Sequence, residues 1–112
     1  MSKAPYRTSA PPETLAHWLH RRRGERGLPL REVAGAAEMD ISLVAKLEKG
    51  ERLPTEAQIL ALAKFFEEDP HTLLVMREAE RLRREFANTP VGAEALRLVA
   101  EETLPYPANG RT

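Results

Sequence analysis

The apolar positions between Leu30 and Gly50 follow a helical spacing that is interrupted once. Asp40 explains the interruption, because its carboxylate can accept hydrogen bonds from the first free N–H groups of a second helix beginning at Ile41. Gly50 adopts a left-handed conformation at little cost and ends that helix. The pattern therefore predicts two short helices joined by a tight turn. The apolar positions that they share are Val33, Ala34, Ala37, Met39, Val44 and Leu47.

Apolar residues at helical spacing also flank this pair of helices. Pro11-Pro12-Glu13 suits the first turn of a helix that is expected to end near Gly24 to Gly27. Thr55-Glu56 begins a fourth helix, and Asp69-Pro70 begins a fifth. These helices are expected to build one core. Its flanking members are Leu15, Trp18, Leu19, Leu28, Ile59, Leu60, Leu62, Ala63, Phe66, Leu73, Leu74 and Met76.

A second amphipathic region follows the fifth helix. Residues 77–86 continue at helical period with a narrow apolar seam, and Thr89-Pro90 opens another helix with an apolar stripe of its own. These two helices are too short to form an independent domain, so they either fold back or build a dimer interface. Dimerisation through residues 77–102 is the favoured interpretation. The residues expected to carry it are Leu82, Phe86, Leu96 and Val99.

The sequence thus predicts an all-α protein: a five-helix domain with one or two extra C-terminal helices. Residues 1–12 are rich in Pro, Ser and Ala and are expected to form a flexible arm. The domain should span 13–76 and the C-terminal helical extension 77–104. Residues 105–112 have the composition of a disordered tail.

Helix, short turn and helix form the helix-turn-helix unit, which presents its second helix to a DNA major groove. The chain from about Leu15 to Leu74 resembles the lambda-repressor-like, or XRE, family of bacterial and phage regulators. The resemblance implies a sequence-specific transcriptional regulator of double-stranded DNA, most simply a dimeric repressor. The matching residues are Arg23, Gly27-Leu28, Arg31-Glu32-Val33-Ala34, Val44, Leu47, Glu48-Lys49-Gly50, Arg52 and Pro54.

The resemblance also implies roles for individual residues. Ser42 and Lys46 can hydrogen-bond to phosphates or base edges, and Ile41 and Leu43 can pack on thymine methyl groups. Arg23 is expected to pair with Glu48 and tie the first helix to the recognition helix. The full expected DNA-binding set is Arg31, Ile41, Ser42, Leu43, Ala45, Lys46, Lys49 and Arg52, of which Lys49 and Arg52 are the best phosphate candidates.

Three positions depart from the family pattern. Pro29 stands where a Ser or Thr cap is typical. Leu30 stands where a Gln that reaches DNA is typical, and it cannot form that hydrogen bond. Glu38 stands at the turn position usually given to Gly. If that position keeps a positive φ, Glu costs about 1 kcal/mol there, and otherwise the turn has a different geometry.

An alternative function uses the same fold as a protein-interaction module. Ile41 and Leu43 form an apolar pair on a short helix, and such pairs often mark a docking surface for another protein.

The role of the arginines in the HRRRGERG segment also has two interpretations. Apart from Arg23, they are expected to be solvated, with phosphate contact as the minority interpretation; they are Arg21, Arg22 and Arg26.

Composition limits the function classes further. The chain has 17 basic and 17 acidic residues, so strong non-specific attraction to DNA is not expected. It has no cysteine, and its three histidines are scattered, so neither a metal site nor a cofactor nor an enzymatic function is indicated. No run approaches the length of a membrane span and the first residues lack a signal-peptide core, so a cytoplasmic protein is expected.

Overall fold

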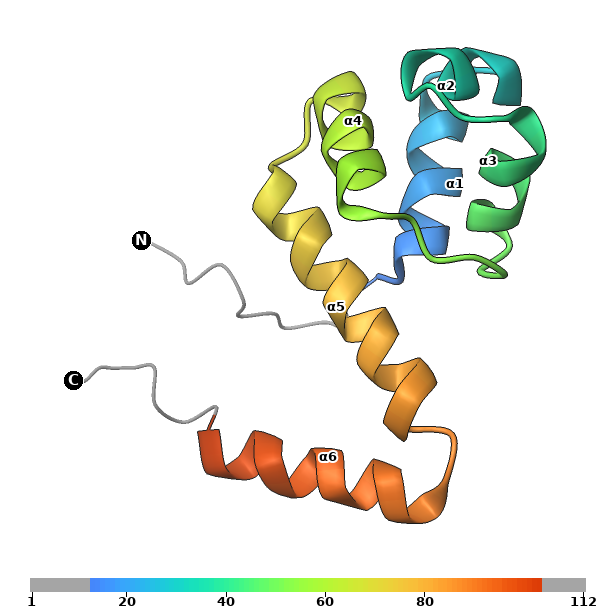
Figure 1. Ribbon diagram of the computed structural model, residues 1–112. Coiled ribbons are helices and arrows are strands. Elements are labelled where there is room, and N and C mark those ends of the chain that lie inside the picture. Colours follow the sequence, from blue (N-terminus) through green and yellow to red (C-terminus); the bar gives the residue numbers. More distant parts are fainter. Residues whose placement is uncertain (1–12, 104–112) are drawn as a thin grey trace. The chain divides into compact units, whose positions relative to one another are not determined.

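The computed structural model describes residues 13–103, and this part of the chain is all-helical (Figure 1). No strand occurs within those residues, as the sequence predicted. The expected flexible arm (1–12) and disordered tail (105–112) lie outside the described residues. The contacts divide the chain into two units, residues 1–80 and residues 81–112. The helices are α1 (Leu15–Glu25), α2 (Leu30–Ala36), α3 (Ile41–Glu48), α4 (Glu56–Phe66), α5 (Pro70–Phe86) and α6 (Pro90–Thr103).

The start of α1 differs from the sequence prediction. Thr14 is the N-cap, and its hydroxyl accepts a hydrogen bond from the backbone N–H of His17. Glu13 therefore precedes the cap and does not lie in the first turn, and Pro11 and Pro12 fall outside the described residues. A hydroxyl cap satisfies a free N–H group directly, which a proline cannot do. The end of α1 at Glu25 agrees with the expected stop near Gly24 to Gly27.

The first four helices and the start of α5 enclose one hydrophobic core. Trp18 packs edge-to-face on Phe66, with ring centroids 5.4 Å apart, and so joins α1 to α4. Leu28 is only half-buried and packs against the edge of this core. Leu60, which was expected inside, is 50% exposed, because α4 buries the other side of its helix through Ile59, Leu62 and Ala63. The buried core residues are Leu15, Trp18, Leu19, Val33, Ala34, Ala37, Val44, Leu47, Ile59, Leu62, Ala63, Phe66 and Leu73.

Local signals place the later helices as predicted. Thr55 and Gln58 form a reciprocal capping box at the start of α4. Asp69 accepts a hydrogen bond from the N–H of His71 at the start of α5, where Pro70 is the first helical residue. The guanidinium of Arg77 donates to the carbonyl oxygen of Pro54, so α5 is also tied to the loop before α4.

The unit of residues 81–112 holds the end of α5 and all of α6. Of the two extra helices expected from the sequence, the first is the continuation of α5, and only α6 is separate. Thr89 caps α6 by accepting a hydrogen bond from the N–H of Gly92. A Cβ atom on Gly92 would collide with the carbonyl group of Phe86, so the corner between α5 and α6 requires glycine there.

Candidate nucleic-acid interface

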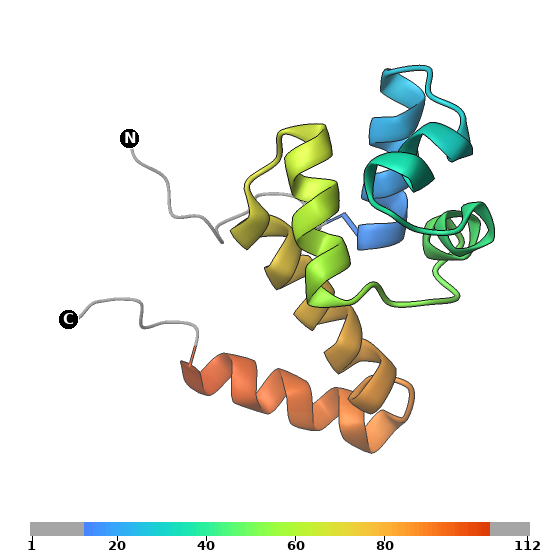
Figure 2. The same cartoon turned by 45° about the horizontal axis from the view of Figure 1, so that its top comes forward.

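A left-handed residue makes the turn between α2 and α3. Glu38 has φ 56°, and the next N–H, of Met39, donates to the carbonyl oxygen of Ala34 over 2.8 Å. These features end α2 and change the direction of the chain. In Figure 2, α3 is therefore seen nearly end-on while α2 is seen from the side. Asp40 occupies the N-cap of α3, as predicted, but its side chain makes no capping hydrogen bond. The sequence interpretation was wrong on this point, because the turn itself sets the start of α3.

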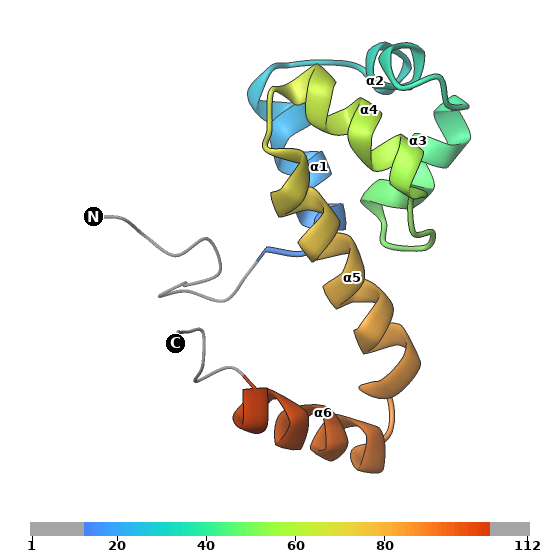
Figure 3. The ribbon, with the colours of Figure 1, turned by 60° about the vertical axis from the view of Figure 1, so that its left-hand side comes forward.

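The two sides of α3 differ sharply in burial. Val44 and Leu47 are buried against α1 and α2, whereas Ile41, Ser42 and Lys46 are exposed and Ala45 is half-buried. Leu43 was expected on the outward side, but it is half-buried against the core. Its position explains this, since residues four apart share one face of a helix and Leu43 lies four residues before Leu47. Figure 3 gives another view of α3, whose helix neighbours are α1 and α2.

An ion pair anchors α3 to α1. The Nε of Arg23 donates to Oε2 of Glu48 over 2.6 Å, and its Nη2 donates to Oε1 over 3.1 Å. The third nitrogen, Nη1, donates to the carbonyl oxygen of Leu28. The Glu48 side chain is only 8% exposed. This is the pair that the family resemblance implied, and its two parallel bonds fix the orientation of α3.

His20 also contacts the Arg23–Glu48 ion pair, and the sequence did not lead us to expect this contact. His20 places Nδ1 3.0 Å from Oε1 of Glu48. Burial by itself would raise the pKa of Glu48, but hydrogen bonds from Arg23 and His20 outweigh burial and lower it. The carboxylate is therefore ionised at neutral pH. The one sequence signal was the position of His20, three residues before Arg23 and so on the same side of α1.

The expected phosphate-binding cations are exposed around α3. Lys49 is the C-cap of α3, and Gly50 follows with φ 76°. The N–H of Glu51 then donates to the carbonyl oxygen of Lys46, which folds the loop back against the helix end. Within residues 13–103, no ion pair engages the cations of the expected DNA-binding set, all of which are exposed: Arg31, Lys46, Lys49 and Arg52.

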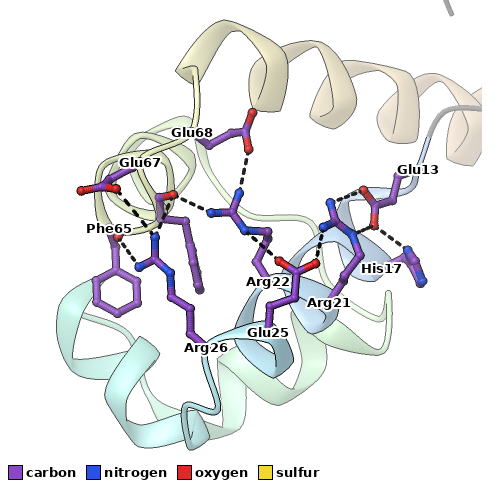
Figure 4. Close-up of polar contacts among 10 residues, drawn as sticks. Glu13, His17, Arg21, Arg22, Glu25, Arg26, Phe65, Glu67 and Glu68 are labelled. Atoms are coloured by element: carbon purple, nitrogen blue, oxygen red, sulfur yellow. Dashed lines mark hydrogen bonds and ion pairs between the residues drawn. The ribbon is translucent and has the colours of Figure 1, made fainter.

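The other arginines of α1 serve the fold (Figure 4). Arg22 donates to the carbonyl oxygen of Phe66 over 2.8 Å and to Glu68 over 2.9 Å, and its guanidinium also lies 5.8 Å from the ring centre of Trp18. Arg26 donates to the carbonyl oxygens of Phe65 and Phe66. These carbonyls end α4 and lack partners in their own helix, so the two arginines cap it.

The expectation that these arginines are solvated was wrong for Arg22, whose side chain is largely buried. Arg26 is exposed as expected, but it also binds a backbone carbonyl oxygen. Arg21, which is more exposed, binds Glu13 and Glu25. All three guanidinium groups therefore already have protein partners, which a phosphate would have to displace.

The match to known families agrees with this geometry. The model of the helix-turn-helix domain family matches residues 14–75, which is more than half of the chain. The chain belongs to the helix-turn-helix domain family. This agrees with the resemblance to lambda-repressor-like regulators, and it identifies the chain in general terms as a DNA-binding regulator of a kind that is typically not enzymatic. No curated protein matches the chain significantly.

The described residues contain neither a metal-binding group nor a membrane-spanning helix. Between residues 13 and 103, no group of three or more His, Cys, Asp or Glu side chains is placed to hold a metal ion. Among the six described helices, none is both long enough and apolar enough to span a membrane.

Proposed function

We propose that this helix-turn-helix protein is a sequence-specific transcriptional repressor that places α3 in the major groove of double-stranded DNA. The observation that carries the proposal is the asymmetry of α3. Val44, Leu47 and Glu48 anchor one side of it, while Ser42 and Lys46 are exposed on the other. Rigid anchoring matters because base readout requires side chains at fixed positions relative to the base edges.

In this arrangement each exposed residue has a distinct role. Ser42 and Lys46 hydrogen-bond to base edges or phosphates, and Lys46 suits the acceptor atoms O6 and N7 of guanine. Ile41, which is 52% exposed, packs on a thymine methyl group. Ala45 has a small side chain and so permits close approach of α3 to the DNA. Lys49 and Arg52 then bind backbone phosphates, with Arg31 on α2 as a further phosphate contact.

The repressor acts as a homodimer through the unit of residues 81–112. Five of the large hydrophobic side chains that are exposed in the monomer belong to this unit, and such a concentration is typical of a protein interface. Leu96 of the predicted interface is half-buried, whereas Leu98, two residues later on α6, is exposed. The exposed residues are Leu82, Phe86, Val91, Leu98 and Val99. Two-fold symmetry would present two copies of α3 to the two halves of a palindromic site.

Selection of duplexes from a random library at low salt tests the proposal. We expect enrichment of a palindromic sequence, and we expect Lys46→Ala or Arg52→Ala to weaken binding to it about tenfold. Lys64→Ala is the matched control, because Lys64 is an exposed lysine on α4, away from α3. Affinity should also fall steeply with salt, since bound phosphates release counterions.

The second candidate is a protein-docking module centred on Ile41. Its exposure favours this function, although the half-burial of Leu43 removes one member of the proposed apolar pair. An absence of any enriched duplex at low salt would contradict the repressor proposal and favour docking. In that case a partner protein should respond to Ile41→Ala and not to Lys46→Ala.

A further inference from the structure

A shallow hollow borders the exposed side of α3. We call it the α1–α3 hollow, and its lining residues are His20, Leu30, Ala45, Glu48 and Lys49. Ser42, Ala45 and Lys49 are spaced three and four residues apart, so they form one stripe along α3. The hollow therefore continues the surface that carries Ser42 and Lys46.

The hydrogen bond to Glu48 fixes where the neutral imidazole of His20 carries its proton. An ionised carboxylate only accepts hydrogen bonds, so Nδ1 of His20, 3.0 Å from Oε1, must be the donor. In the neutral ring Nε2 is then a bare acceptor, which repels a phosphate oxygen. In the protonated ring Nε2 becomes a donor on a positively charged group. No partner for Nε2 is present within residues 13–103, and the side chain is 67% exposed.

The charges that face His20 come from two helices. They are Glu48 and Lys49 on α3 and Arg23 on α1. Leu30, from α2, carries no charge. Because Arg23 neutralises Glu48, Lys49 leaves the cluster with one net positive charge, and protonation of His20 raises this to two. A phosphate placed beside Lys49 would add a negative charge and favour proton uptake further.

We propose that the α1–α3 hollow receives one phosphate of the DNA backbone, held by Lys49 and by the protonated form of His20, so that DNA binding takes up a proton at His20. The inference rests on the proposed function, because it requires that α3 meet DNA. It adds a pH dependence that the helix-turn-helix fold does not itself impose. It also assigns a ligand to a side chain outside the recognition helix.

The test measures affinity for the enriched palindromic duplex at about pH 6 and about pH 8, at one fixed salt concentration, over the range in which histidine charge changes. The wild-type chain should bind five- to tenfold more tightly at the lower pH, a change of about one order of magnitude or less as expected for one proton. His20→Gln should remove this difference. His17→Gln is the matched control, because His17 lies on the same helix, is 65% exposed and binds the carboxylate of Glu13, but does not line the hollow.

A second variant keeps the test valid if loss of the imidazole weakens the fold. His20→Lys carries a permanent positive charge, so its affinity at about pH 8 should match that of the wild-type chain at about pH 6. The slope of log affinity against log salt should be smaller in His20→Gln at the lower pH, by at most about 0.9, because Lys49 still contacts the same phosphate. Thermal melts of each variant would confirm that the comparison is made between folded proteins.

The outcomes separate this inference from the proposed function. If the duplex binds and Lys46→Ala weakens it, but His20→Gln keeps the full pH dependence, only the inference is overturned. The same holds if His17→Gln loses as much pH dependence as His20→Gln, or if wild-type affinity does not change with pH. If no duplex is enriched at all, the proposed function itself fails.

Discussion

At the scale of single residues, Glu38 shows a cost that the turn imposes on the fold. It is held at φ 56°, a conformation in which a side chain is strained and glycine is not. The sequence left open whether this position keeps a positive φ, and the structure shows that it does. The turn geometry has therefore been kept although the residue usual at this position has been replaced.

Glu38→Gly should raise the free energy of unfolding by about 1 kcal/mol, because it removes this strain. Part of the gain is offset by the greater freedom of glycine in the unfolded chain. Glu32→Gly is the matched control: Glu32 lies inside α2 with helical geometry, so the substitution should destabilise by about 1 kcal/mol. Chemical denaturation measures both changes. A loss of stability in Glu38→Gly would contradict the strain argument.

The contacts of Glu48 predict how stability depends on pH. The pKa of Glu48 is lowered in the folded protein, so its contribution is fully present above its ordinary value of 4.5 and is lost as pH falls through the lowered value. Arg23→Ala should cost about 3 kcal/mol at neutral pH, because it leaves the Glu48 carboxylate uncompensated. Denaturation at several pH values should show a smaller acid-induced loss in Glu48→Gln than in the wild-type chain. An equal loss in both would show that other carboxylates, such as Glu13, dominate.

At the scale of helices, the sequence predicted elements well and their contacts less well. Apolar spacing and caps located α2 to α5 because those signals lie within one or two turns of each helix end, as with Thr55 and Asp69. His20 and Arg22 were missed because their partners, Glu48 and Phe66, lie 28 and 44 residues away. Spacing along one helix does not reveal which side chain of another helix will face it.

The capping of α4 by α1 can be tested directly. Arg22→Ala should lower the free energy of unfolding by about 2 kcal/mol, since it removes the shorter of the two arginine hydrogen bonds to the Phe66 carbonyl and the contact with Glu68. Arg21→Ala serves as the control, because the Arg21 side chain is 40% exposed and an exposed ion pair contributes little to stability. DNA affinity of the folded Arg22→Ala protein should equal that of the wild-type chain. A marked loss of DNA affinity without a loss of stability would instead support phosphate contact by Arg22.

At the scale of the whole molecule, net charge makes the oligomeric state important. With 17 basic and 17 acidic residues, a single copy has only local clusters of cations to offer to DNA. A dimer doubles those clusters on one palindromic site, and the second copy of α3 binds at the effective concentration set by the first. The proposed repressor therefore depends on the exposed apolar residues of the 81–112 unit for affinity as well as for symmetry.

The dimer predicts a specific loss on substitution of those residues. Phe86→Glu or Val99→Glu should convert a dimer to a monomer in sedimentation, because a carboxylate buried in an apolar interface is strongly unfavourable. Each variant should keep its fold, since both side chains are about half exposed in the monomer. Leu60→Glu is the matched control, because Leu60 is equally exposed but lies on α4. Affinity for a full palindrome should fall at least tenfold in the two interface variants, while affinity for a single half-site should stay unchanged. If Leu60→Glu dissociates the dimer and Val99→Glu does not, the interface lies on the helix-turn-helix domain, and the role proposed for α6 is wrong.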